Sequence, residues 1–192
     1  MSYQQDISGC IARGPDATGL SDSAFEEALN VCVPALNRLR KAQANDEMPF
    51  LDLPVQSAGV SAAFNLVEKI RCRASEIVVL GTGGSSLGGR TLVSLREDPL
   101  ARSSKHQVHF FDNIDPHSMD CLLSDLDLTN TVFITISKSG ETPSTISQFL
   151  ICLDAVSKLG GRAALAEQFV VITAPGDSPL RRCATSLSLP VL

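Results

Sequence analysis

Two hydroxyl-rich loops carry the side chains in this sequence that are best suited to chemistry. The first loop, GTGGSSLGGR, spans residues 81–90 and directly follows a short apolar run. Its glycines let backbone N–H groups approach an anion closely, and the helix that should follow supplies partial positive charge. Hydroxyl donors come from Thr82, Ser85 and Ser86. The loop therefore predicts an anion site, and the alternative is a tight strand-to-helix turn that binds nothing.

The spacing of this first loop differs from two common nucleotide-binding motifs. The P-loop pattern G-x-x-x-x-G-K-[ST] is absent, together with its lysine. The dinucleotide fingerprint would need a third glycine where Ser86 stands. Asp112, after the second apolar run, stands where a ribose-binding acid could lie, so a dinucleotide-binding fold stays open as an alternative.

The second loop, SKSGETPST, spans residues 137–145 and follows the third apolar run. Ser137, Ser139 and Thr142 present hydroxyls, and Lys138 adds a point charge suited to phosphate. In the alternative interpretation, Thr142 is a plain N-cap of the helix that Pro143 begins, and Lys138 lies in solvent. For this loop alone both interpretations stay open.

The elements that must position these loops are short apolar runs that alternate with helix-length segments. Four runs occupy residues 77–80, 108–111, 132–136 and 169–173, and a fifth begins within 187–192. Runs that are apolar on both faces and separated by helices predict a parallel sheet in an α/β fold. In a flavodoxin-like strand order, 2-1-3-4-5, both loops line one crevice at the carboxyl ends of strands one and three. A phosphorylated small molecule fits that crevice, and no metal or other cofactor is required.

Helical patterns precede the sheet and separate its strands. Apolar residues recur at helical spacing up to about Arg40 and again over residues 62–70, and Ser23 and Glu26 form a capping box for the first helix. Pro34 predicts a kink or break in that helix. Three later helices should each begin at a capping residue that precedes a proline, namely Asp115, Thr142 and Ser178.

We therefore expect a three-layer α-β-α sandwich over residues 75–192, preceded by an N-terminal helical segment over residues 1–74 that packs on it. Six dispersed cysteines without a C-x-x-C pair predict reduced thiols and no zinc site. The net charge of −5 and the lack of a basic run argue against nucleic acid and anionic membranes as partners. No signal peptide or membrane span is apparent, so we expect a cytoplasmic protein.

Together the two loops resemble the signature loops of the sugar isomerase (SIS) domain family, in the setting of the N-terminal SIS domain of glucose-6-phosphate isomerases. Two further segments are similar to that family: FFDNIDPHSM, residues 110–119, and VITAPGDSPLRRCA, residues 171–184. They correspond to the stretches that follow strands two and four. The fold that the resemblance implies is the same parallel, flavodoxin-like sheet.

The resemblance also implies roles for individual residues. Gly84 and Ser85 would contact the sugar or its phosphate. The phosphate would be bound through the hydroxyls of Ser137, Ser139 and Thr142, with Lys138 beside them.

The family interconverts glucose 6-phosphate and fructose 6-phosphate by ring opening and proton transfer through an enediol. The Glu, His, Lys and Arg that the resemblance assigns to this chemistry would lie beyond Leu192. We therefore expect part of a larger, dimeric enzyme and no isomerase activity from these 192 residues alone. His106, His109, His117 and Glu141 make no complete acid/base set. The alternative is a free-standing SIS domain that senses a sugar phosphate without turnover.

Overall fold

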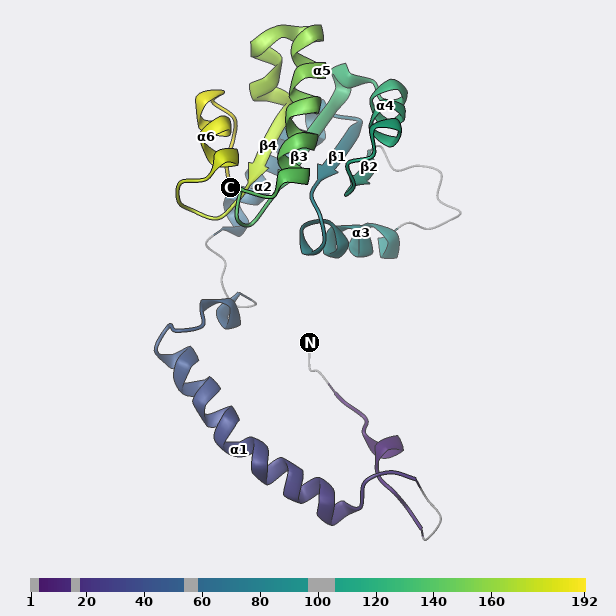
Figure 1. Ribbon diagram of the computed structural model, residues 1–192, viewed down its shortest axis with the longest axis vertical. Coiled ribbons are helices and arrows are strands. Elements are labelled where there is room, and N and C mark those ends of the chain that lie inside the picture. The colour runs from purple at the N-terminus through teal and green to yellow at the C-terminus, as the bar shows by residue number, and fades with distance from the viewer. Residues whose placement is uncertain (1–3, 15–17, 54–58, 97–105) are drawn as a thin grey trace. The chain divides into compact units, whose positions relative to one another are not determined.

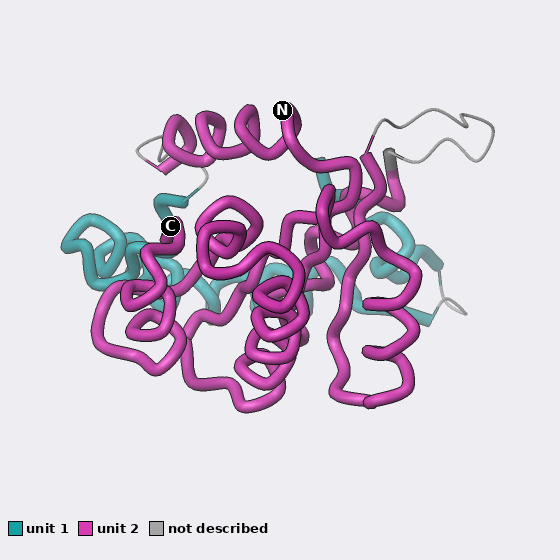
Figure 2. Tube along the Cα trace, turned by 90° about the horizontal axis from the view of Figure 1, so that it is seen from above, with its two compact units in different colours: residues 1–57 teal, residues 58–192 magenta. Residues whose placement is uncertain are grey.

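The chain divides into two compact units, residues 1–57 and 58–192, which Figure 2 colours separately. The computed structural model describes residues 4–14, 18–53, 59–96 and 106–192. The predicted limit at residues 74 and 75 falls inside the second unit. The reason is that Ile70, on the helix before that limit, packs against Val132 and Val170 of the sheet.

The first unit contains one long helix, α1 (Asp22–Ala44), flanked by short 3-10 helices η1 (Ser8–Cys10) and η2 (Pro49–Asp52). The N-cap of α1 is Ser21, whose Oγ accepts a hydrogen bond from the N–H of Ala24 at 3.2 Å. The predicted capping box at Ser23 is therefore wrong by two residues, because Ser23 lies inside the helix. Pro34 lies within α1 and does not end it.

The second unit carries the sheet and the helices around it (Figure 1). In chain order its elements are α2 (Val60–Arg73), β1 (Glu76–Leu80), α3 (Gly84–Arg96), β2 (Gln107–Phe111), α4 (Pro116–Asp125), η3 (Leu128–Asn130), β3 (Thr131–Ile136), α5 (Pro143–Gln168), β4 (Phe169–Ile172) and α6 (Pro179–Ser186). The α5 range contains a kink at Gly161, where the backbone leaves helical geometry. No described helix is long and apolar enough to cross a membrane.

The strands form one parallel sheet in the order β2-β1-β3-β4, which confirms the strand order predicted from the sequence. Leu80, at the end of β1, pairs with Phe111 of β2 and Thr135 of β3. The last residues continue the sheet: Val191 bridges Val171, and the N–H of Val171 donates to Pro190 O at 2.9 Å. This isolated bridge lies within the residues predicted to begin a fifth strand, and the described sheet itself has four strands.

Each face of the sheet packs against its own helices, because successive side chains of a strand point to opposite faces. On one face the ring of Phe133 stacks on Phe169 with centroids 5.0 Å apart, and Phe149 of α5 meets Phe169 edge-on at 5.7 Å. On the other face Val132 packs with Ile70 of α2. The three-layer α-β-α arrangement follows, and it leaves the carboxyl ends of the strands free to carry loops.

Candidate anion-binding site

The carboxyl ends of β1 and β3 lie side by side, and the loops that follow them meet. A Cβ atom on Gly81 would come within 2.9 Å of Ile136 O and 3.0 Å of Ser85 Cβ, so this approach of the two loops requires glycine. Both loops border one cavity of about 530 Å³. Its lining residues are Thr82, Ser85, Ile136, Lys138, Ser139, Thr142, Thr145 and Ala174.

The second loop turns sharply at Gly140 and is fixed there from both sides. Gly140 has φ +65°, and its N–H donates to Ser137 Oγ at 3.1 Å. Its carbonyl oxygen accepts a hydrogen bond from the N–H of Leu180 at 3.1 Å. A Cβ on Gly140 would collide with the side chain of Ser178. The loop therefore keeps its shape only with glycine at this position.

Thr142 stands at the N-cap position of α5 but does not cap the helix. Its side chain makes no hydrogen bond to the first turn, and its Oγ1 lies 3.2 Å from Ser137 Oγ instead. The capping role predicted for Thr142 is therefore wrong, whereas those of Asp115 and Ser178 are confirmed. Asp115 accepts from the N–H of Ser118 at 2.8 Å, and Ser178 accepts from that of Arg181 at 3.3 Å.

The start of α5 is consequently open to a ligand. Pro143 has no N–H, and no hydrogen bond joins the N–H groups of Ser144 and Thr145 to another described residue. Unsatisfied N–H groups and the helix dipole both favour an anion at this end. The uncapped helix start and the hydroxyls around it make this cavity suited to a phosphate group.

The predicted site residues lie at different depths. Ser85, Lys138, Ser139 and Thr142 line the cavity together. Ser137 is only 2% exposed and is not among the lining residues, but its hydroxyl is paired with that of Thr142. Gly84 opens α3 and is not among the lining residues.

The family resemblance gives no role to two hydroxyls that line the cavity. Thr82 belongs to the first loop, where the sequence indicates only a hydroxyl donor. Thr145 is 1% exposed, and its Oγ1 has no hydrogen-bond partner among the described residues. The signal that could have found Thr145 is its spacing, because it lies three residues after Thr142 and so on the same face of the helix. Ser86, by contrast, is fully buried and donates to Gly83 O at 3.4 Å.

The charge that lines the cavity is positive. Lys138 is the only charged side chain among the lining residues, and its carbonyl oxygen is held by the N–H of Ala174 at 3.1 Å. Ser139 Oγ accepts from the N–H of Glu141 at 3.2 Å, while the Glu141 side chain does not line the cavity. Hydroxyls, amides and one ammonium group without a carboxylate can bind an anion through hydrogen bonds and charge.

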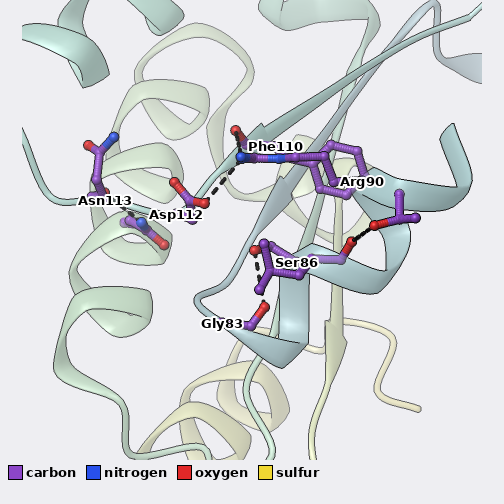
Figure 3. A network of polar contacts seen from close by, with 9 residues as sticks. Gly83, Ser86, Arg90, Phe110, Asp112 and Asn113 are labelled. Carbon is purple, nitrogen blue, oxygen red and sulfur yellow. Dashed lines mark hydrogen bonds and ion pairs between the residues drawn. The ribbon is translucent and has the colours of Figure 1, made fainter. Parts of the chain in front are cut away.

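The other titratable groups considered from the sequence lie away from this cavity. His109 Nε2 lies 2.7 Å from Glu76 Oε2, and His106 Nδ1 lies 2.7 Å from Ala74 O. Asp112, the alternative ribose-binding acid, forms an ion pair with Arg90 at 3.1 Å (Figure 3). No group of three or more His, Cys, Asp or Glu side chains in the described part of the chain could hold a metal ion.

A smaller cavity of about 280 Å³ lies at the opposite, amino end of the strands, beside Ala74, Thr131 and Gln168. The two charged residues that line it, Arg73 and Glu167, already form an ion pair with each other. It therefore offers no unpaired charge to a ligand, and the cavity between the loops is the better candidate.

Comparison with known proteins identifies the family of the chain. The family model described as phosphoglucose isomerase matches residues 67–178, which is more than half of the chain and includes both loops. The chain belongs to the phosphoglucose isomerase family.

Two relatives within the phosphoglucose isomerase family illustrate how much of a complete protein the chain represents. It is 32% identical over 180 residues to a protein of Haloquadratum walsbyi named as a probable glucose-6-phosphate isomerase, covering 92% of this chain and 40% of that relative. It is 33% identical over 162 residues to a glucose-6-phosphate isomerase of Carboxydothermus hydrogenoformans, covering 81% of this chain and 35% of that relative. The chain thus spans less than half the length of either one.

The fold of this chain is also similar to part of a solved structure. A crystal structure of a hypothetical protein from Thermus thermophilus superimposes with a TM-score of 0.70 and 26% identity. The match covers 89% of this chain and 41% of that one. The two proteins therefore share the α/β sandwich over most of this chain, and not only around the candidate site.

Proposed function

We propose that this chain is the phosphate-binding part of a glucose-6-phosphate isomerase and holds the phosphate group of glucose 6-phosphate or fructose 6-phosphate. The observation that carries this proposal is the open start of α5, where Thr142 turns its hydroxyl to Ser137 and leaves the first turn uncapped. A phosphate dianion accepts hydrogen bonds from such N–H groups and is stabilised by the helix dipole.

The hydroxyls of Ser85, Ser139 and Thr142 surround the cavity next to this helix start. The hydroxyls of Ser139 and Thr142 would donate to the phosphate oxygens, and Lys138 would add a positive charge at short range. Ser137 acts through Thr142, since the pairing of the two hydroxyls fixes where the Thr142 oxygen lies. The sugar would extend from the phosphate toward the first loop, where the family resemblance assigns Gly84 and Ser85.

Aldose-ketose isomerisation needs a base near the C1 and C2 protons, a proton shuttle for ring opening, and a cation near the developing oxyanion. Among the lining residues only Lys138 is titratable. We therefore assign binding to these 192 residues and the proton transfers to the remainder of a complete isomerase. We further propose that the complete enzyme is a cytoplasmic homodimer, as the resemblance implies.

A free-standing SIS domain that binds a sugar phosphate without turnover is the second candidate function. The observation that favours it is the same lack of an acid/base set at the cavity. The two functions share the binding site and differ in what surrounds it.

Calorimetric titration of the purified chain with fructose 6-phosphate tests the shared binding claim. Saturable binding that inorganic phosphate competes away is the expected result. Failure to bind either ligand would overturn the proposal. An isomerase assay on the polypeptide encoded by the complete open reading frame separates the two functions, because only the first predicts turnover.

A further inference from the structure

The four residues that follow the middle of β2, Phe110 to Asn113, join the two walls of the candidate site. We call them the connector, residues 110–113. Phe110 O accepts a hydrogen bond from Arg90 Nη2 of α3 at 3.2 Å. Asn113 O accepts one from Gln148 Nε2 of α5 at 2.6 Å. The helix that begins in the first loop and the helix that follows the second loop are therefore bonded to the same short segment.

Arg90 holds α3 on the connector through several contacts at once (Figure 3). Its Nη2 lies 3.1 Å from Asp112 Oδ2, and its guanidinium lies 5.7 Å from the centre of the Phe110 ring. A planar guanidinium can bond and stack in this way, which an ammonium group cannot reproduce. The neighbouring Gly89 also packs closely, since a Cβ there would be 3.1 Å from the Phe110 ring.

Gln148 holds α5 on the connector from the other side. Gln148 itself is 1% exposed, and the hydrogen bond from its Nε2 to Asn113 O is partly buried. Gln148 lies in α5, three residues after Thr145 and six residues after Thr142. A shift of Gln148 would move the start of α5 with it, because the intervening residues are helical.

The connector also bonds to the first loop directly. The N–H of Gly81 donates to Phe111 O at 3.3 Å. The distance between Ser85 in one loop and Thr142 in the other thus depends on one segment that is not itself among the residues lining the cavity.

We propose that Arg90 and Gln148 are positioning residues that set the separation of the two loops and so make the site prefer a sugar phosphate to inorganic phosphate. The proposal rests on the proposed function and names the groups that determine its selectivity. Inorganic phosphate needs only the second loop and the start of α5. A sugar phosphate must contact both loops at once, so its affinity depends on their separation.

Arg90→Met tests this proposal, because it keeps an unbranched side chain, although a shorter one, and removes the hydrogen bond and the ion pair. The affinity for fructose 6-phosphate should fall by about tenfold, as expected for loss of a charged hydrogen bond. The affinity for inorganic phosphate should stay within about twofold, since the second loop is unchanged. Arg71→Met is the matched control, because within the described part of the chain the exposed side chain of Arg71 on α2 pairs with Glu68 alone, so both affinities should stay unaltered.

Two milder variants guard against a general loss of folding. Asp112→Asn removes the ion-pair charge with almost no change in volume, and Gln148→Met removes the bond to Asn113 O within a similar volume. Each should lower the affinity for fructose 6-phosphate and spare that for inorganic phosphate. Arg90→Lys should restore affinity only in part, since it keeps the charge without the planar fork.

Three results would overturn the proposal. If Arg90→Met, Asp112→Asn and Gln148→Met all bind both ligands like the wild type, the connector does not position the loops. If every variant loses affinity for both ligands equally, the connector serves the folding of the chain in general. If the wild-type chain binds neither ligand, the proposed function fails as well; in the first two cases it stands.

Discussion

The hydroxyl oxygens of Ser137 and Thr142 lie 3.2 Å apart, so the residue at the N-cap of α5 bonds to the loop before it and not to the helix after it. A threonine in this position ordinarily satisfies an N–H of the first turn. Here that bond is absent, and the first turn keeps its N–H groups for a ligand. The same pairing holds the Thr142 oxygen at the edge of the cavity.

Gly140→Ala should destabilise the folded chain. The new Cβ would meet Ser178 and force φ +65° on a residue with a side chain, so the free energy of unfolding should drop by about 2 kcal/mol or more. Urea denaturation measures the change. Gly88→Ala is the control, because a Cβ there meets nothing within 4 Å in helix α3; it should raise the free energy of unfolding by about 0.5 to 1 kcal/mol. Equal effects of the two variants would contradict this account of the loop.

Thr145→Val should separate stability from binding. The Thr145 hydroxyl is buried without a partner among the described residues, so replacing it with a methyl group should raise the free energy of unfolding by about 1 kcal/mol. The affinity for fructose 6-phosphate should nevertheless fall, because Thr145 lines the cavity. Thermal denaturation and calorimetry measure the two effects, and Thr145→Ser should restore affinity. A variant that is less stable and binds normally would show that the hydroxyl serves the fold alone.

Much of the fold follows from local sequence patterns. The runs around Val79, Phe110, Ile134 and Val170 are apolar on both faces and are bounded by helix signals, so their role as parallel strands was predictable. The limit between the two compact units could not be predicted from these patterns. The amphipathic pattern of α2 shows that Ile70 is buried, but it does not show that its partners are Val132 and Val170 of the sheet.

The candidate site was predictable in its chemistry and less so in its geometry. Hydroxyl and glycine content marked both loops, and the strand order brings them together. Sequence patterns could not show that Thr142 bonds to Ser137, because a hydroxyl next to proline can accept from the helix or pair with the loop. The contact of Arg90 with Phe110, 20 residues away, likewise depends on how α3 lies against β2.

Cys152 should be the least reactive thiol of the chain. Burial raises the pKa of this thiol from 9.0 to about 12, whereas Cys10, Cys32, Cys72 and Cys121 are exposed. At about pH 8, below the ordinary thiol pKa, iodoacetamide should alkylate the four exposed cysteines and spare Cys152 until the chain unfolds. Mass spectrometry of tryptic peptides measures this, and rapid labelling of Cys152 in the folded chain would contradict it.

The same thiol should make stability depend on pH in the alkaline range. In the unfolded chain its pKa is near 9.0, while in the folded chain it stays protonated up to about 12. Its contribution is therefore complete below pH 9.0 and is lost as the pH rises toward 12. Cys152→Ala should weaken this alkaline loss in urea denaturation, and parallel curves for the two proteins would refute the assignment.

The 192-residue chain should bind fructose 6-phosphate without converting it. Lys138 is the only titratable group among the described residues that line the cavity, and these residues supply neither the base nor the proton shuttle for the enediol step. A coupled assay for glucose 6-phosphate should give the background rate at any chain concentration. Turnover that increases in proportion to the chain and survives further purification would contradict this prediction.

The central claim is that the loop of Ser137 and Thr142 holds the phosphate at the start of α5, and calorimetric titration of the Ser137→Ala/Thr142→Ala variant tests it most directly. The wild-type chain should bind fructose 6-phosphate, and the double variant should bind it at least about tenfold more weakly, because two hydroxyls near a charged ligand are removed. Equal affinity of the two proteins would contradict the account.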